Sequence, residues 1–233
     1  MGNSINAKQV LRKTFWWTKN ITILLFQIAL LSATLYRVVP VPLTPLMVIR
    51  FEGIKHQWVP YEKINKNVVV AAMTAEDPNF NTHWGFELKA IKDAYENNTD
   101  DDGKPMRGGS TISQQTAKNV FLFPGKGITR YVRKGLEIPF TFLIEAMWTK
   151  RRIMEIYLNS IEMGTGVYGI EAAGNYYFRK SAATLSAKEA AAIVVCFPNP
   201  RERNPAVLKP KLQRKRDRTV RWMAGYQLPD NLK

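Results

Sequence analysis

An almost charge-free stretch near the N-terminus restricts what this chain can fold into more than any other feature. Residues Ile21 to Tyr36 carry no charged side chain, and Gln27 is the most polar of them. Extended to 19–39, the segment reaches the roughly 20 residues that a helix needs to span a bilayer. It shows no polar face, which disfavours a helix packed on a soluble core. With the interfacial pair Trp16 and Trp17 just before it, the segment predicts a transmembrane anchor.

The flanks of this stretch predict its orientation. Four basic residues and no acidic residue precede it: Lys8, Arg12, Lys13 and Lys19. By the positive-inside rule, residues 1–18 stay in the cytoplasm. We therefore expect a single-pass protein of the cytoplasmic (inner) membrane, with the remaining chain periplasmic or otherwise extracytoplasmic. A cleaved signal peptide is the alternative, but Ser32-Ala33-Thr34 is a weak cleavage signal.

The charge balance narrows the kinds of partner. The 233-residue chain has a formal net charge of +15, so we expect anionic partners such as phosphate-bearing substrates or lipids. Nucleic acid is not expected, because the location is extracytoplasmic and no recognition motif is present. Cys196 is the single cysteine and lies in an apolar run, which favours a core position. His56 and His83 have no partner at zinc-ligand spacing.

The chain after the anchor divides into three segments. Three prolines within six residues open a linker and membrane-proximal segment, 40–67, in which Met47–Glu52 and His56–Pro60 are expected to be extended. Residues 68–205 follow a helical pattern and predict a mainly α domain. Residues 206–233 form a basic C-terminal segment, which suits anionic headgroups.

Periodicity and capping signals predict the helices of the central domain. They are Phe86–Asn97, Ser110–Asn119, Leu136–Asn159 and Ser186–Phe197. The last one opens with a capping box, Ser186-Ala187-Lys188-Glu189. Asn97–Gly109 is polar and glycine-rich and predicts a loop. Pro139 is expected to kink or restart its helix. The apolar segment Phe121–Pro124 fits a membrane interface and a core position equally well.

Two adjacent acids are the first candidates for chemistry. Glu76 and Asp77 follow the small-residue segment Ala71–Ala75 and precede Pro78, which ends a helix. A carboxylate that loses solvent in such a place has a raised pKa and can act as a base. The simpler interpretation is that Asp77 caps a helix and that Glu76 is incidental. On composition alone, that simpler interpretation is the better one.

Two later segments carry groups that bind phosphates or sugars. Arg107–Asn119 combines glycines, hydroxyls and amides with Lys118, which suits a phosphate or a sugar at a helix start. Its spacing is not that of a P-loop. Further on, Arg133 and Glu137 are four residues apart and share a helix face. They form either a surface ion pair or a cationic site for a leaving phosphate.

In this order the segments resemble the glycosyltransferase domain of bacterial peptidoglycan synthases, glycosyltransferase family 51. The shared patterns are EDPNFxxHxG, GGSTISQQxxKN, RKxxE and KRRIMEIYLN, and they run from about Val68 to Pro205. The anchor and the short C-terminus resemble the monofunctional branch, the biosynthetic peptidoglycan transglycosylases. The Ser-x-x-Lys and Lys-Thr-Gly motifs of a penicillin-binding transpeptidase domain are absent.

The resemblance implies a fold and a reaction. The fold is mainly α and lysozyme-like, with a small membrane-facing lobe, behind one transmembrane helix. The reaction polymerises lipid II into β-1,4-linked glycan strands with inversion and releases undecaprenyl pyrophosphate. Glu76 matches the general base that deprotonates the acceptor hydroxyl. Glu137 matches a second catalytic glutamate that assists at the pyrophosphate, directly or through a divalent cation (Mg²⁺ or Mn²⁺). No organic cofactor is expected.

The resemblance also implies a substrate-binding set, in which three cations stabilise the departing pyrophosphate. The set is Asp77, Phe80, His83, Gly109, Ser110, Thr111, Gln114, Gln115, Lys118, Asn119, Arg133 and Lys134, and the three cations are Lys118, Arg133 and Lys134. The expected partners are lipid II, the growing glycan strand, the membrane and other proteins of cell-wall synthesis or division.

The sequence differs from the family pattern at residues 178–180, and two other functions compete with this assignment. Phe178-Arg179-Lys180 stands where Phe-Gly-Lys is expected, so the turn there is expected to differ. A muramidase or lytic transglycosylase shares the fold class and needs one acid, but its reaction has no pyrophosphate for clustered cations to bind. A membrane-tethered basic binding protein explains the charge but not the grouping of Glu76, Ser110–Lys118 and Glu137.

Overall fold

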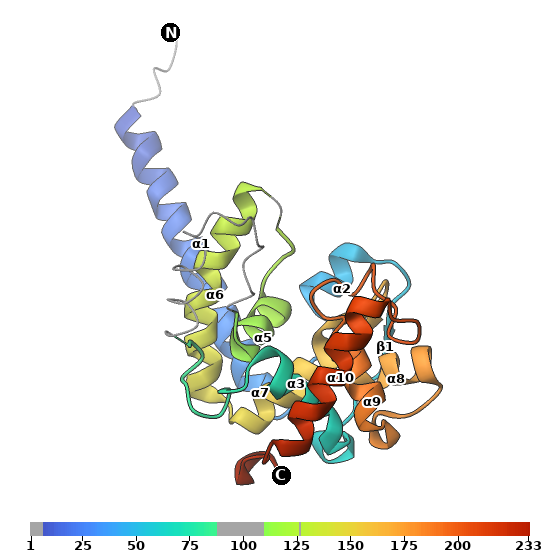
Figure 1. The fold of residues 1–233 in the computed structure, drawn as a ribbon. Helices are drawn as coiled ribbons and strands as arrows, with labels where there is room; N and C mark the ends of the chain where they lie inside the picture. The colour runs from blue at the N-terminus through green and yellow to red at the C-terminus, as the bar shows by residue number, and fades with distance from the viewer. Residues whose placement is uncertain (1–6, 88–109, 126) are drawn as a thin grey trace, which may run out of the picture. The chain divides into compact units, whose positions relative to one another are not determined.

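The computed structural model describes residues 7–87, 110–125 and 127–233 (Figure 1). The chain divides into two compact units, Met1–Val39 and Pro40–Lys233. The predicted helix Phe86–Asn97 lies almost wholly outside the described residues, and the predicted loop Asn97–Gly109 lies wholly outside them.

The first unit consists of one long helix, α1 (Ala7–Tyr36). Residues Gln9–Tyr36 of α1 are long and apolar enough to cross a membrane. Large apolar side chains such as Leu25, Phe26 and Leu31 are exposed along it, as lipid contact requires. The helix begins well before the predicted span 19–39, because nothing in the preceding basic segment stops it.

The second unit is mainly helical, as predicted, with one small sheet. Its helices are α2 (Pro45–Arg50), α3 (Lys66–Glu76), α5 (Ile112–Phe121), α6 (Ile128–Met147), α7 (Lys150–Ser160), α8 (Ile170–Phe178), α9 (Ala187–Val194) and α10 (Pro210–Gly225). Short 3-10 helices are η1 (Tyr61–Lys63), η2 (Ala182–Thr184) and η3 (Asp230–Leu232). The strands are β1 (Lys55–His56), β2 (Glu162–Gly164) and β3 (Val167–Tyr168), in the order β1-β3-β2.

Two groups of helices build the core. In one group α3 packs against α9 and α10, and in the other α5 packs against α6 and α7. The apolar positions of α7, which lies within the helix predicted over Leu136–Asn159, are buried, including Ile153, Met154 and Ile156. The predicted capping box at Ser186 and Glu189 is present and starts α9. Both segment 40–67 and segment 206–233 belong to the same compact unit as the central helices.

Two sequence expectations about local structure are wrong. Met47–Glu52 is not extended, because Thr44 caps a helix there and Pro45 occupies its first position, where proline is favoured. The predicted helix Leu136–Asn159 is two helices. It breaks at Trp148, and Thr149 caps α7 by accepting a hydrogen bond from the Arg152 amide.

Pro139 does not restart a helix, since it lies inside α6, which continues on both sides of it. One part of the segment Phe121–Pro124 packs in the core, and another part is exposed. Leu122 is buried and Phe121 stacks on Phe140, whereas Phe123 is 38% exposed.

The turn at Arg179 keeps the geometry that a glycine would adopt. Arg179 ends α8 in the left-handed conformation, with φ 54° and ψ 38°. Its amide donates to the Asn175 carbonyl at 3.2 Å, and the Lys180 amide donates to the Gly174 carbonyl at 3.2 Å. The chain therefore makes a glycine-type helix end with an arginine.

Candidate active site

Glu76 is the last residue of α3, and the sequence around it explains its position. Asp77 leaves the helix with φ −157°, and Pro78 cannot continue it. The carboxylate of Glu76 is half-buried, and its Oε2 accepts a hydrogen bond from Gln115 Nε2 at 3.1 Å. The base predicted from the first motif thus meets a side chain of the second motif, 39 residues further on.

The surroundings of Glu76 favour its neutral form. Burial raises the pKa of Glu76 above the usual glutamate range, and the neighbouring Asp77 adds to the rise. The hydrogen bond from Gln115 and the charges of Lys215 and Lys118 oppose this rise without cancelling it. A carboxylate with a raised pKa is a stronger base, so the site suits proton abstraction from a hydroxyl.

Asp77 has the capping role that the simpler interpretation gave it. It is buried, and its Oδ2 accepts a hydrogen bond at 2.9 Å from the amide of Ile112, the first residue of α5. Both carboxylate oxygens also face Nε2 of His83, at 2.9 and 3.1 Å. Asp77 and His83 therefore position the start of α5. Phe80 is fully buried beneath the ammonium of Lys150, so it packs in the core.

Some residues of the second motif stabilise the start of α5, and others line a pocket. Thr111 and Gln114 form a capping box at the start of α5, and both are buried. Ser110 accepts a hydrogen bond from Lys134 Nζ at 2.9 Å. Gln115, Lys118 and Asn119 follow on α5 and line a pocket. Gly109, also in the predicted set, lies outside the described residues.

The third motif lies on α6. Glu137 is buried, and its carboxylate is 2.8 Å from Lys134 Nζ and 3.4 Å from Arg133 Nε. The backbone at Glu137 is helical despite Pro139, and the Glu137 carbonyl accepts a hydrogen bond from the Thr141 hydroxyl at 2.6 Å. Glu137 therefore holds the two cations of its own motif in place.

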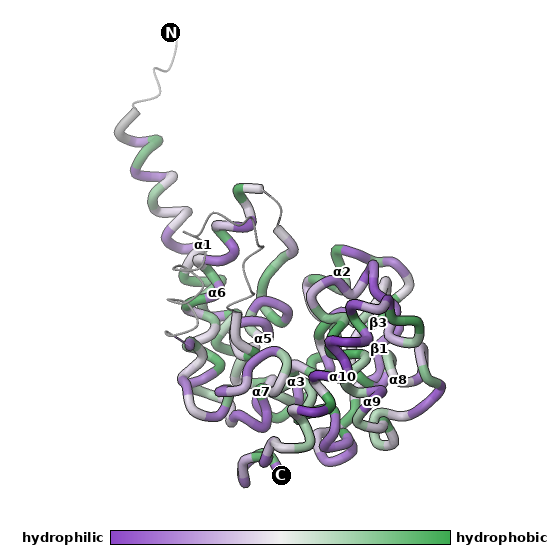
Figure 2. The backbone as a smooth tube through the Cα atoms, viewed as in Figure 1, coloured by the Kyte–Doolittle hydropathy of each residue, from purple (hydrophilic) through white to green (hydrophobic). Residues whose placement is uncertain are grey.

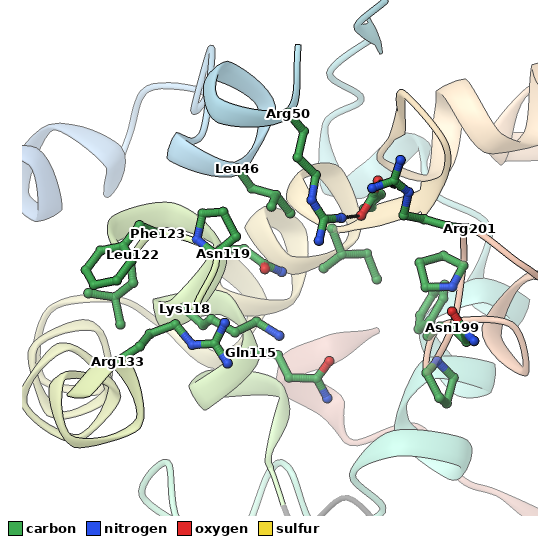
Figure 3. Close-up of a pocket in the computed structure, with 16 residues that line it drawn as sticks. Leu46, Arg50, Gln115, Lys118, Asn119, Leu122, Phe123, Arg133, Asn199 and Arg201 are labelled. Carbon is green, nitrogen blue, oxygen red and sulfur yellow. Dashed lines mark hydrogen bonds and ion pairs between the residues drawn. The ribbon is translucent and has the colours of Figure 1, made fainter. Parts of the chain in front are cut away.

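A pocket of about 310 Å³ is lined by residues of the second and third motifs (Figure 3). Lys118 and Arg133 lie side by side at one end, close to Gln115. Burial lowers the pKa of Lys118, and the charge of Glu137 is the main opposing influence. Lys118 is short of solvent and lies beside a second cation, Arg133, so this end of the pocket suits a phosphate.

Sequence reasoning missed the far end of the pocket. Arg50 from α2 and Arg201 from the loop after α9 both approach Glu162, and Arg50 forms an ion pair with it. Arg201 also binds Glu52 at 2.5 Å. No local motif marks these residues. Lys215 on α10, whose ammonium interacts with Glu76, was also missed because it lies in a run of basic residues.

Glu137, the residue predicted to assist through a divalent cation, is paired with two basic side chains. Its carboxylate is contacted by Arg133 and Lys134, and Glu137 belongs to no group of three or more possible metal ligands among the described residues. The described residues do contain another group with ligand atoms within 4.8 Å of one another: Asp77, His83 and Glu87. In that group, Asp77 is already engaged by His83 and by the Ile112 amide.

Comparisons with known proteins identify the family that this geometry suits. Residues 44–224 match the family described as Transglycosylase, and the chain belongs to that family of enzymes. A "Biosynthetic peptidoglycan transglycosylase" of Caulobacter vibrioides is 52% identical over 172 residues, which cover 72% of this chain and 73% of the relative. Proteins of the same description from Bdellovibrio bacteriovorus and Bacteroides thetaiotaomicron are 50% and 42% identical. Their alignments cover 83% and 96% of this chain, and 78% and 90% of the relatives.

Proposed function

We propose that this enzyme is a peptidoglycan glycosyltransferase that polymerises lipid II into β-1,4-linked glycan strands. The observation that carries the proposal is the half-buried Glu76, hydrogen-bonded to Gln115 beside a pocket that holds Lys118 and Arg133. A base and a phosphate-binding cation pair at one site match a reaction that removes a hydroxyl proton and expels a pyrophosphate.

In the proposed step, Glu76 takes the proton from the 4-hydroxyl of the acceptor sugar. The hydroxyl oxygen attacks the anomeric carbon of the donor strand from the face opposite the leaving group, so the configuration inverts. The bond from that carbon to undecaprenyl pyrophosphate breaks, and the leaving oxygen carries the electron pair. Lys118 and Arg133 stabilise the charge that develops on the pyrophosphate.

Glu137 supports this step as a positioning residue. Its contacts fix Arg133, which lines the pocket, and Lys134, which also binds Ser110, so these cations need not be ordered during the reaction. The proposed step uses no divalent cation, because Glu137 is already paired. Polymerisation in the presence of EDTA tests this point, and loss of the product would show that a metal is required.

The same proposal places the enzyme at the cytoplasmic membrane. Helix α1 anchors the chain with its basic N-terminal end in the cytoplasm, and the domain lies outside. Exposed apolar residues gather on two elements of the domain, Ile49 and Phe51 at α2 and Ile128 and Tyr131 at the start of α6. These residues suit contact with the bilayer that holds the substrate, where tethering raises its effective concentration.

The test is polymer formation from purified lipid II, with wild type and Glu76→Gln compared. Glu62→Gln is the matched control, because Glu62 is an exposed glutamate whose partner is Arg151. We expect polymer with wild type and with the control, and at least a hundredfold lower rate with Glu76→Gln. Cleavage of existing glycan without polymer formation would refute the synthase function in favour of a lytic enzyme.

A further inference from the structure

A second concave surface lies along α10, outside the pocket already described. It is a groove of about 780 Å³ between α10 and the loop before it. Seven of its lining residues are cationic: Arg203, Lys209, Lys211, Arg214, Lys215, Arg218 and Arg221. Figure 2 shows the hydrophilic colour over much of α10.

The positive charge of this groove is almost uncompensated. Asp217 is the single acid among the described lining residues, and it is paired with Arg216, 2.7 Å away and outside the lining set. Within the described parts of the chain, no carboxylate forms an ion pair with any of the seven cations. Because so many like charges repel one another, the groove is more stable with an anionic ligand bound.

The groove lies next to the pocket of the active site. Pro198 borders both the groove and the pocket that holds Lys118 and Arg133. Lys215 is half-buried in the groove, and its charge interacts with that of Glu76. A ligand that leaves the catalytic centre past Lys215 therefore enters this groove directly.

The extent of the positive charge favours an elongated ligand. From Lys209 to Arg221 the helix advances by about 18 Å, at 1.5 Å per residue. One pyrophosphate needs only a few of these cations, whereas a chain with repeated charges engages all of them. A bilayer is flat and would reach the exposed cations but not the half-buried Lys215.

We propose that the α10 groove holds the nascent glycan strand through the carboxylates of its peptide branches while further units are added. The inference rests on the proposed function. Attraction between charges needs no fixed register, so a strand can slide along the groove as it grows, as proteins slide on nucleic acid. The groove would then determine how many units are added before a strand is released.

The test compares wild type with the triple variant Lys211→Gln, Arg214→Gln and Arg221→Gln. All three positions are exposed, so the fold should survive, and thermal unfolding checks this. The control variant carries Lys63→Gln, Lys66→Gln and Lys188→Gln, which removes the same charge from exposed positions outside the groove.

Two measurements use each protein. The first is affinity for purified, uncross-linked glycan strands, with and without their peptides. We expect a tenfold or greater loss of affinity in the groove variant alone, and weak binding of peptide-free strands by all proteins. The second is the mean strand length made from lipid II. We expect strands at least twofold shorter from the groove variant at a similar initial rate, and shorter wild-type strands at high salt.

The outcomes separate this inference from the proposed function. If wild type makes no polymer, the proposed function fails, whereas strand affinity still reports on the groove. If the groove variant binds strands and sets strand length as the control does, the inference is wrong. If the groove variant matches the control in both measurements and, in a separate assay, binds vesicles of anionic phospholipid less tightly, the groove is a membrane contact and the inference is equally wrong.

Discussion

Replacement of Arg179 by glycine is expected to stabilise the protein. Arg179 is a non-glycine residue with a φ of 54°, and it ends α8 in the left-handed region. Its side chain is exposed and forms no ion pair within the described part of the chain, so the substitution removes no contact that holds the fold. The backbone conformation is therefore what the substitution changes.

The size of the effect follows from two opposing contributions. The left-handed conformation costs a residue with a Cβ roughly 1–2 kcal/mol, and glycine does not pay this cost. Glycine instead gains freedom in the unfolded chain, which offsets roughly 0.5–1 kcal/mol. The net increase in the free energy of unfolding is about 0.5–1 kcal/mol, which raises the Tm of a domain of this size by roughly 1–4 °C.

Thermal unfolding of the full chain in detergent measures this difference, with Arg179→Ala and Arg179→Asn alongside. Alanine keeps the Cβ and should give no gain, whereas asparagine tolerates the left-handed region and should be intermediate. An equal rise in Tm for alanine and glycine would refute the reasoning, because the gain would then come from loss of the arginine side chain.

Three further predictions concern the site. Glu76→Gln should raise Tm at neutral pH, because burial raises the pKa of Glu76 and so penalises its charged form. The gain in Tm should shrink as pH falls toward the ordinary glutamate pKa, because Glu76 then becomes neutral, as glutamine is at every pH. Lys118→Met should lower kcat roughly 10²- to 10³-fold in the polymerisation assay, with Lys188→Met unchanged. Asp77→Ala should lower the free energy of unfolding by about 2–3 kcal/mol in denaturant titrations, because the Ile112 amide and His83 lose their buried acceptor.

Local signals predicted the parts of the fold that local chemistry determines. The capping box at Ser186 and the buried face of α7 depend on residues within one or two turns, and the structure confirms both. The break at Trp148 was missed because the apolar period continues on both sides of it, although Thr149 is a good N-cap. The helix at Met47 was missed because a short apolar run is compatible with either a strand or a helix.

The sequence predicted the residues of the candidate site only where they belong to a motif. The order of the motifs placed Glu76, Lys118 and Glu137 in one site, and these residues do line or adjoin one region. Arg50, by contrast, lies 112 residues from its partner Glu162, and no local pattern links the two. Such contacts arise from tertiary packing, which a single sequence does not display.

The Asp77 contact with α5 also makes the catalytic geometry insensitive to the length of the chain between them. The end of α3 and the start of α5 are joined directly, by Asp77 to the Ile112 amide and by the Thr111 hydroxyl to the Gly85 carbonyl at 2.6 Å. The distance from Glu76 to Gln115 is therefore set by these two hydrogen bonds rather than by the chain that connects the two helices, so the first two motifs keep their mutual geometry without depending on that connection.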